Sequence, residues 1–231
     1  MRIGGVQKVT FIDYPQKIAC TVFTIGCNFK CPFCQNSHLV LPEKIKSLKE
    51  IPERDFFSFL KERKDFLEGV VICGGEPTIY SDLPGFARKI KKLGFLVKLD
   101  TNGSNPKMLE DLIREKLIDY VSLDVKAPKE KYDKVCGKKI DIRKIEKSIE
   151  ILKKREIDYE FRTTLVPTLI EKEDIFKIVK WISPAKRYYL QNFQPQNTID
   201  PSFEKIKPFD NKYLLEIKKI ISPFFEMCEI R

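Results

Sequence analysis

Residues 18–36 read IACTVFTIGCNFKCPFCQN. The first seven residues form a compact apolar run that predicts a buried strand, and a loop with three cysteines follows it. Further apolar runs predict strands over residues 69–73, 95–99, 120–125, 159–165 and 188–193. Strands with nearly continuous apolar faces are typical of parallel sheets that are covered on both sides by helices.

Amphipathic helices are predicted between these strands. Their apolar residues recur at steps of three and four over residues 53–64, 83–93, 106–113, 142–152, 175–182 and 214–221. Six strand–helix units indicate an α/β fold with parallel strands, either an open partial (β/α)6 barrel or a doubly wound sheet. No linker-like change in composition interrupts the chain, so a single domain over residues 1–231 is expected.

Composition and charge exclude several classes of protein. No apolar run approaches the roughly 18 residues of a membrane helix, and no signal peptide is visible, so we expect a cytoplasmic protein without a membrane partner. The formal net charge is +10, with lysines and acids interspersed. This pattern is typical of a thermophilic surface or of a surface that meets an acidic protein. Basic clusters are not interleaved with aromatic residues, so binding to nucleic acid is not expected.

Polar motifs end or follow the predicted strands. They are GGEP (74–77), DTNG (100–103), DVK (124–126), RTT (162–164) and LQNF (190–193). The carboxyl ends of parallel strands meet at one edge, which predicts an active-site rim there. Gly75 lets the backbone approach a ligand closely, and Glu76 can hold an ammonium group. Asp124 and Lys126, two residues apart, face the same way. Plain turns and a surface ion pair are the simpler interpretations.

Three cysteines, Cys27, Cys31 and Cys34, lie within eight residues. Seven cysteines in a reducing compartment favour metal or redox chemistry over disulfides. The triplet can hold zinc with His38 as a fourth ligand, or an iron–sulfur cluster in which one iron stays open. Three inert buried thiols are the remaining alternative, and the other four cysteines show no metal-like spacing.

The spacing CxxxCxxC, with Phe33 directly before the third cysteine, resembles the radical S-adenosylmethionine (radical SAM) superfamily. The GGEP motif resembles the second hallmark of the same superfamily. The resemblance implies a radical SAM partial (β/α)6 barrel and a [4Fe–4S] cluster held by Cys27, Cys31 and Cys34. It also implies that the open iron chelates S-adenosylmethionine, which the reduced cluster cleaves. No catalytic residue beyond the cluster and its bound cofactor is expected.

Residues 3–36 extend the resemblance. The stretch IGGVQKVTFIDYPQKIACTVFTIGCNFKCPFCQN looks like the opening of the anaerobic ribonucleoside-triphosphate reductase activating proteins. It is similar more widely to the glycyl-radical-enzyme activases, including pyruvate formate-lyase activating enzyme. This likeness implies that the protein abstracts hydrogen from a backbone glycine of a partner, anaerobic ribonucleotide reductase. An acidic flavodoxin or ferredoxin is the expected electron donor.

The resemblance also implies roles around the methionyl end of S-adenosylmethionine. Gly75 and Glu76 match the turn that contacts the amino group. Asp100 and Thr101 match an acid and a hydroxyl near the methionyl end, with a monovalent cation close by. Lys126 is assigned to the carboxylate and Asp124 to the ribose or cation region.

Three further contacts are implied at the adenosyl end. Phe33 matches an aromatic residue near the adenine, and Arg162 matches a position that contacts the adenosyl group. Relatives offer a histidine to the ribose from the sixth strand, where this chain has Gln191 and Asn192. Either amide is expected to donate in its place.

Other functions remain open at this stage. One is a radical SAM enzyme for a small molecule, similar to 7-carboxy-7-deazaguanine synthase. Another is an activase of a different glycyl-radical enzyme, such as pyruvate formate-lyase. A zinc- or cluster-bearing module that binds nucleic acid is the non-enzymatic alternative.

Overall fold

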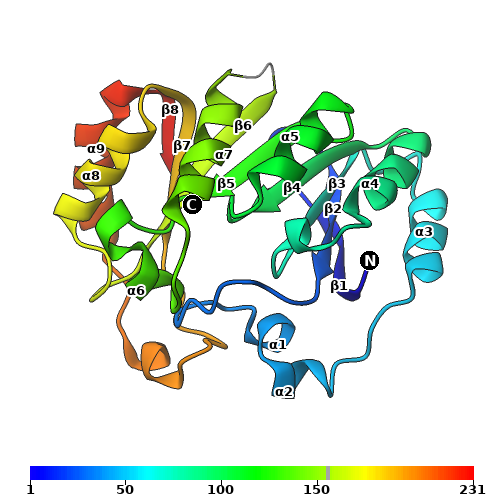
Figure 1. Ribbon diagram of the computed structural model, residues 1–231, viewed down its shortest axis with the longest axis horizontal. Coiled ribbons are helices and arrows are strands. Elements are labelled where there is room, and N and C mark those ends of the chain that lie inside the picture. Colours follow the sequence, from blue (N-terminus) through cyan, green and yellow to red (C-terminus); the bar gives the residue numbers. More distant parts are fainter. Residues whose placement is uncertain (155–156) are drawn as a thin grey trace. The chain divides into compact units, whose positions relative to one another are not determined.

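The computed structural model describes residues 1–154 and 157–231, which form two compact units (Figure 1). The first unit comprises residues 1–28, 38–101 and 105–121. The second comprises residues 29–37, 102–104 and 122–231. A single domain over residues 1–231 therefore stays a prediction.

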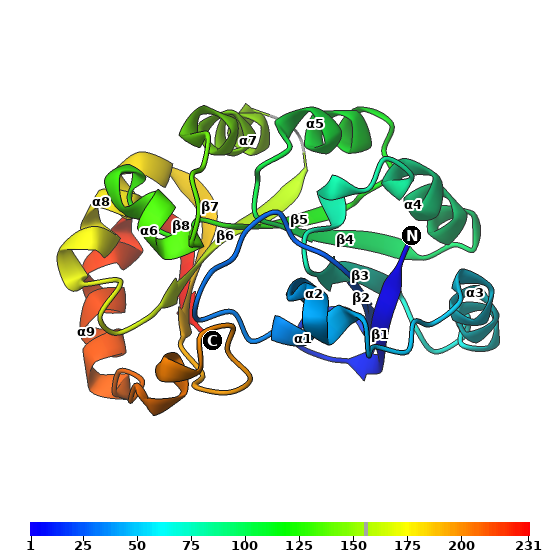
Figure 2. The same cartoon turned by 60° about the horizontal axis from the view of Figure 1, so that its bottom comes forward.

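Four strands lie in chain order in the first unit. They are β1 (Ile3–Thr10), β2 (Ala19–Thr24), β3 (Gly69–Gly74) and β4 (Leu96–Thr101). The parallel pairs β2–β3 and β3–β4 match Val22 with Ile72 and Ile72 with Leu99, all of them buried. The helices are α1 (Ser37–Val40, Ser37 lying in the second unit), α2 (Pro42–Ile45), α3 (Glu53–Glu62), α4 (Leu83–Lys92) and α5 (Pro106–Arg114). Figure 2 shows α4 and α5 on one side of β3 and β4.

The second unit contains a parallel arrangement of β6 (Asp158–Leu165), β7 (Ala185–Asn192) and β8 (Phe225–Ile230). Its helices are α6 (Tyr132–Cys136), α7 (Ile142–Lys154), α8 (Lys172–Ile182) and α9 (Asn211–Ile221). Each of α7, α8 and α9 buries an apolar stripe, as the sequence predicts. Strand β5 (Tyr120–Asp124) begins in the first unit and ends in the second.

All six predicted strands are present, but β1 and β8 were missed. Strand β1 pairs antiparallel with β2, so the sheet has an antiparallel strand beside the predicted parallel ones. Both missed strands carry exposed polar residues among apolar ones, as in QKV and CEI. An edge strand needs only one buried face, so it lacks the continuous apolar run by which the buried strands were identified.

Glycine, asparagine and proline occupy helix ends where their backbone or side-chain chemistry is favourable. Gly94 follows α4 with φ +95°, a conformation that suits glycine at the end of a helix. Pro106 occupies the first turn of α5, and the Asn105 side chain accepts a hydrogen bond from the Met108 N–H. In the described part of the chain, every helix is too short or too polar to span a bilayer.

Candidate functional site

In the first unit, the loop after β3 is fastened to the end of β2. The Gly75 N–H donates to the Thr24 carbonyl at 2.8 Å, and the Glu76 N–H donates to the Gly26 carbonyl at 2.8 Å. A Cβ on Gly75 would lie 1.8 Å from the Gly26 oxygen, so only glycine fits. Since Gly26 directly precedes Cys27, the hydrogen bond from Glu76 to Gly26 also fixes the backbone next to the first cysteine.

The carboxylate of Glu76 is buried, with 1% of the residue exposed. Its Oε1 atom accepts from the Thr78 N–H at 3.1 Å, the Thr78 hydroxyl at 2.5 Å and the Thr101 hydroxyl at 2.7 Å. The bond from the Thr78 N–H caps a short 3-10 helix that begins at Pro77. Two predicted site residues, Glu76 and Thr101, are thus brought together, and the three donors are neutral.

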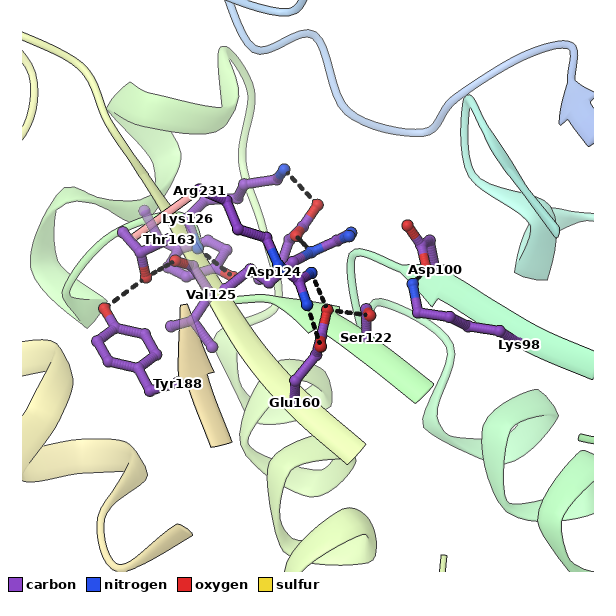
Figure 3. A network of polar contacts seen from close by, with 12 residues as sticks. Lys98, Asp100, Ser122, Asp124, Val125, Lys126, Glu160, Thr163, Tyr188 and Arg231 are labelled. Atoms are coloured by element: carbon purple, nitrogen blue, oxygen red, sulfur yellow. Dashed lines mark hydrogen bonds and ion pairs between the residues drawn. The ribbon is translucent and has the colours of Figure 1, made fainter. Parts of the chain in front are cut away.

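Asp100 lies at the end of β4 and forms an ion pair with Lys98 on the same strand (Figure 3). Asp100 was predicted as a site residue, but Lys98 was not. The sequence K-x-D within a strand contains the necessary signal, because residues two apart project from the same face.

In the second unit, residues 29–37 form the cysteine loop, which rests on the end of α6. The Lys30 N–H donates to the Cys136 carbonyl at 2.9 Å. Gly137 follows with φ +67°, and a Cβ there would lie 2.2 Å from the Lys30 oxygen. This support was not predicted. In the sequence, Gly137 after Cys136 indicates the end of a helix. Nothing in the sequence indicates that this helix end contacts the cysteine loop at Lys30.

Two more contacts fix the cysteine loop around Phe33, which is buried. The Asp200 N–H donates to the Pro32 carbonyl at 2.9 Å. The Gln35 amide donates to the Gln194 carbonyl at 2.8 Å. The loop is therefore tied to two segments that lie more than 150 residues further along the chain.

The thiols of Cys31 and Cys34 differ in their surroundings. The hydrogen bond from Cys136 lowers the pKa of the Cys31 thiol, burial opposes this shift, and the Lys126 ammonium supports it. Burial raises the pKa of the Cys34 thiol. A turn joins the two residues, since the Cys34 N–H donates to the Cys31 carbonyl at 3.0 Å.

Asp124 and Lys126 lie beside each other (Figure 3). Together with Arg162, which also pairs with Asp124, they form one charged cluster. The Lys126 ammonium and the Arg162 Nε–H each donate to Asp124 at 2.8 Å. Burial would raise the pKa of Asp124, but the charges of Arg162 and Lys126 hold it well below the ordinary value. Burial would lower the pKa of Lys126, but the charge of Asp124 and the neighbouring Cys31 and Cys34 side chains raise it.

A buried carboxylate that was not predicted lies in the same unit. Glu160 accepts from the Ser122 hydroxyl at 2.6 Å and from the Arg231 guanidinium at 2.9 and 3.2 Å. The guanidinium also stacks on the Tyr189 ring, 3.6 Å from the ring centroid. Glu160 and Arg231 are 71 residues apart, and nothing in the sequence pairs them.

The end of β7 carries the two amides predicted to contact the ribose. The Asn192 Nδ2 group donates to the Phe209 carbonyl at 2.9 Å. Among the described residues, Asn192 Oδ1 is the one buried side-chain nitrogen or oxygen without a hydrogen-bond partner. The Asn192 Oδ1 atom therefore has capacity to accept a hydrogen bond. Gln191 is half-buried beside it.

The thiols of the triplet suit an iron–sulfur cluster chemically, since all three are free of disulfides and thiolates are the usual ligands of iron in such clusters. Cys27 belongs to the first unit, whereas Cys31 and Cys34 belong to the second. In residues 1–154 and 157–231, no group of three His, Cys, Asp or Glu side chains is gathered to hold a metal ion. His38, the fourth ligand of the zinc alternative, is exposed on α1.

Comparison with known sequences gives two extensive matches. The profile of the radical SAM superfamily matches residues 21–182. A protein of Methanocaldococcus jannaschii, provisionally named as a glycyl-radical enzyme activating enzyme, is 37% identical over 235 aligned positions. The alignment covers 99% of this chain and 95% of that relative.

Solved structures are similar in fold. SuiB of Streptococcus suis bound to S-adenosylmethionine aligns with a TM-score of 0.66 at 19% identity, over 89% of this chain and 48% of SuiB. This chain thus spans about half of SuiB. A domain of pyruvate-formate lyase-activating enzyme from Bacteroides vulgatus aligns with a TM-score of 0.56 at 14% identity, over 71% of this chain and 98% of that domain. These likenesses confirm the predicted fold class, a partial (β/α)6 barrel with parallel strands.

Proposed function

Because the chain belongs to the radical SAM superfamily, we propose that it activates a glycyl-radical enzyme by abstracting hydrogen from one backbone glycine of that partner. The superfamily uses a [4Fe–4S] cluster and S-adenosylmethionine as cofactors. The match with the Methanocaldococcus jannaschii relative carries the proposal, since it extends over nearly the whole of both chains.

Cys27, Cys31 and Cys34 are the proposed ligands of the cluster. When bound and reduced, the cluster would supply one electron for the reductive cleavage of S-adenosylmethionine, and the radical fragment released from the cofactor would take the hydrogen atom from the glycine. The chain holds the cysteine segments by their backbones, at Gly26 in the first unit and at Lys30 in the second. The Lys126 ammonium stabilises the thiolates of Cys31 and Cys34.

Glu76 is the proposed partner of the cofactor's ammonium group, and Gly75 offers backbone beside it. The donors from Thr78 and Thr101 hold the Glu76 carboxylate in place and carry no positive charge of their own. A buried negative charge of this kind attracts a cationic ligand group. Asp100 and Thr101 are proposed to border the same methionyl end.

Lys126 is the proposed partner of the cofactor's carboxylate. Asp124 fixes the ammonium of Lys126 and the guanidinium of Arg162, so its role in the ribose region is to position these two cations. Arg162 is assigned to the adenosyl group. The pKa of Lys126 is raised, so the group remains a cation through the neutral range.

The remaining contacts concern the adenine and the ribose. Phe33 is the proposed neighbour of the adenine. Asn192 is proposed to accept a hydrogen bond from a ribose hydroxyl, because its buried Oδ1 atom lacks a partner in the described part of the protein. Gln191 is the second candidate for this contact.

Anaerobic ribonucleotide reductase is the partner that we propose. The opening stretch of residues 3–36 supports this branch over pyruvate formate-lyase. An acidic flavodoxin or ferredoxin is the proposed electron donor, since the formal net charge of this chain is +10. We assign the reaction to the cytoplasm, where reducing conditions keep cysteines free.

Electron paramagnetic resonance tests the proposal. Anaerobically reconstituted protein, which should bind about four irons, is incubated with S-adenosylmethionine, a reductant and a candidate reductase. A glycyl-type doublet on the reductase is the expected result. Its absence with every glycyl-radical enzyme of the same cell, together with cleavage of the cofactor, would contradict the activase and favour a small-molecule substrate.

Two matched variants serve as controls. Cys31→Ala should abolish the visible absorption of the cluster, cofactor cleavage and the glycyl signal. Cys73→Ala should preserve all three, because Cys73 lies on β3 outside the triplet. Colourless protein that carries stoichiometric zinc after reconstitution would exclude the cluster.

A further inference from the structure

One lysine is fully buried within β4 of the first unit. The exposed fraction of the Lys98 side chain is 0%, and its ammonium donates to Asp100 Oδ1 (Figure 3). The Lys98 Nζ also lies 5.9 Å from the centroid of the Tyr120 ring. Lysine is almost never buried to this extent unless its charge is paired. The Lys98–Asp100 pair is therefore a buried ion pair within the strand, in contrast to the exposed ion pairs of the surface.

The position of the pair connects it with the candidate cofactor site. Asp100 is followed by Thr101, whose hydroxyl donates to Glu76 Oε1 at 2.7 Å. Two buried carboxylates, those of Asp100 and Glu76, thus lie at one end of β4. Lys98 cancels the charge of Asp100, whereas the donors to Glu76 described above are neutral. A free cation would meet an aspartate whose charge is already compensated.

We propose that Lys98 is a tethered counter-cation of Asp100, and that its ammonium takes the place of the free monovalent cation expected near Asp100 and Thr101. A lysine ammonium and K⁺ carry the same single charge, but the ammonium is held covalently at every salt composition. Cofactor binding by this protein should therefore be independent of K⁺ and Na⁺. The inference concerns the cofactor site of the proposed function but not the identity of the partner enzyme.

The test compares salts of equal ionic strength. Reconstituted wild-type protein is placed in potassium, sodium or tetramethylammonium chloride, the last having a cation too large for a buried carboxylate. Affinity for S-adenosylmethionine, from anaerobic equilibrium dialysis, and the melting temperature are measured in each. We expect both quantities to be the same in all three salts.

Lys98→Met removes the charge and keeps an apolar stem. In tetramethylammonium chloride this variant should bind S-adenosylmethionine more weakly, on the order of 30-fold, and melt earlier, because Asp100 loses the ammonium that compensates its charge. Potassium or sodium should restore most of both losses. The double variant Lys98→Met/Asp100→Asn should lose this response, since no uncompensated charge remains.

Lys91→Met is the matched control. Lys91 pairs with Asp119 at 2.7 and 2.8 Å in the same unit, so the variant also loses an ion pair. It should show no difference among the three salts.

Three outcomes would overturn the inference: tighter cofactor binding by the wild type in potassium than in tetramethylammonium, no salt response in Lys98→Met, or the same response in Lys91→Met. If Lys98→Met fails to fold, the wild-type comparison decides. These measurements need no partner protein, so their failure is separate from the absence of a glycyl radical on the reductase.

Discussion

Two carboxylates, Glu76 in the first unit and Asp124 in the second, are held in opposite ways. In the first, the bonds that Glu76 accepts from Thr78 and Thr101 come from neutral groups. In the second, Asp124 is bound by an ammonium and a guanidinium. Neutral donors keep a carboxylate ionised and leave its charge available to a cationic ligand, whereas paired cations cancel it. Glu76 is thus suited to bind a cationic ligand group, and Asp124 is suited to position the side chains of Lys126 and Arg162.

The units are alike in how they support the cysteine segments. Gly75 lies against the carbonyl of Gly26, and Gly137 lies against the carbonyl of Lys30. In both cases the approach is between backbones, and it leaves no room for a side chain. The difference is that Gly137 also needs a positive φ, +67°.

The largest predicted effect is that of Gly75→Ala. Its Cβ would lie 1.8 Å from backbone oxygen, which cannot move as a flexible side chain can. We expect a loss of roughly 3–5 kcal/mol in the free energy of unfolding, measured by denaturant titration. Gly137→Ala should cost roughly 2–4 kcal/mol, because a clash at 2.2 Å adds to the strain of a left-handed conformation.

Gly85→Ala is the control for both substitutions. Gly85 lies in α4, and a Cβ there meets nothing within 4 Å. Alanine should therefore stabilise the helix by about 0.5–1 kcal/mol. Equal losses in all three variants would contradict the idea that backbone approach makes Gly75 and Gly137 necessary.

The second prediction separates positioning from binding. Asp124→Asn removes the negative charge that pairs with Lys126 and Arg162, and should lower the free energy of unfolding by about 2–4 kcal/mol. Glu76→Gln retains an oxygen for the neutral donors and should cost only about 1 kcal/mol. For binding of the cofactor's ammonium group we expect the opposite order, with the larger loss in Glu76→Gln and the smaller loss in Asp124→Asn. Glu76→Gln should weaken S-adenosylmethionine binding about 30-fold or more with the iron content unchanged.

Lys126→Met extends this comparison to the cofactor's carboxylate, with an expected loss of affinity of similar size. Isothermal titration under anaerobic conditions measures both variants. Unchanged affinity in Glu76→Gln and in Lys126→Met would remove both residues from the cofactor site.

The third prediction concerns pH and the Asp124 cluster. The pKa of the Asp124 carboxyl group in the folded state lies below the ordinary value of about 4. A carboxyl with a lowered pKa contributes stability above that ordinary value, and the contribution is lost as pH falls below it. The stability difference between wild type and Asp124→Asn should therefore shrink from pH 7 to about pH 3. The denaturant titrations at each pH use protein without the iron–sulfur cluster, because acid decomposes such clusters. A difference that stays constant over this range would show that the charge of Asp124 is not responsible.

Short-range features of the site could be predicted from the sequence, and long-range ones could not. The spacing of Asp124 and Lys126 within a strand predicts a shared face, and the two residues do pair. Lys98 and Asp100 have the same spacing, but Asp100 alone was predicted as a site residue. The contact between Cys31 and Cys136 joins positions 105 residues apart, and no pattern in one sequence encodes such a distance.

The last and smallest effect concerns an exposed lysine, in contrast to the buried Lys98 and Lys126. Lys30 has its backbone fixed in the cysteine loop, but its side chain is exposed. An acidic electron donor is steered by such charges over the Debye length, about 10 Å at 0.1 M salt. Reduction of the cluster by flavodoxin or ferredoxin should slow as ionic strength rises, and Lys30→Glu should slow it several-fold at low salt. Lys212→Glu makes the same charge change on an exposed site of α9, and dithionite tests for damage to the cluster. Equal slowing in both variants would assign the effect to net charge, and a rate independent of salt would leave the basic surface without a role in electron transfer.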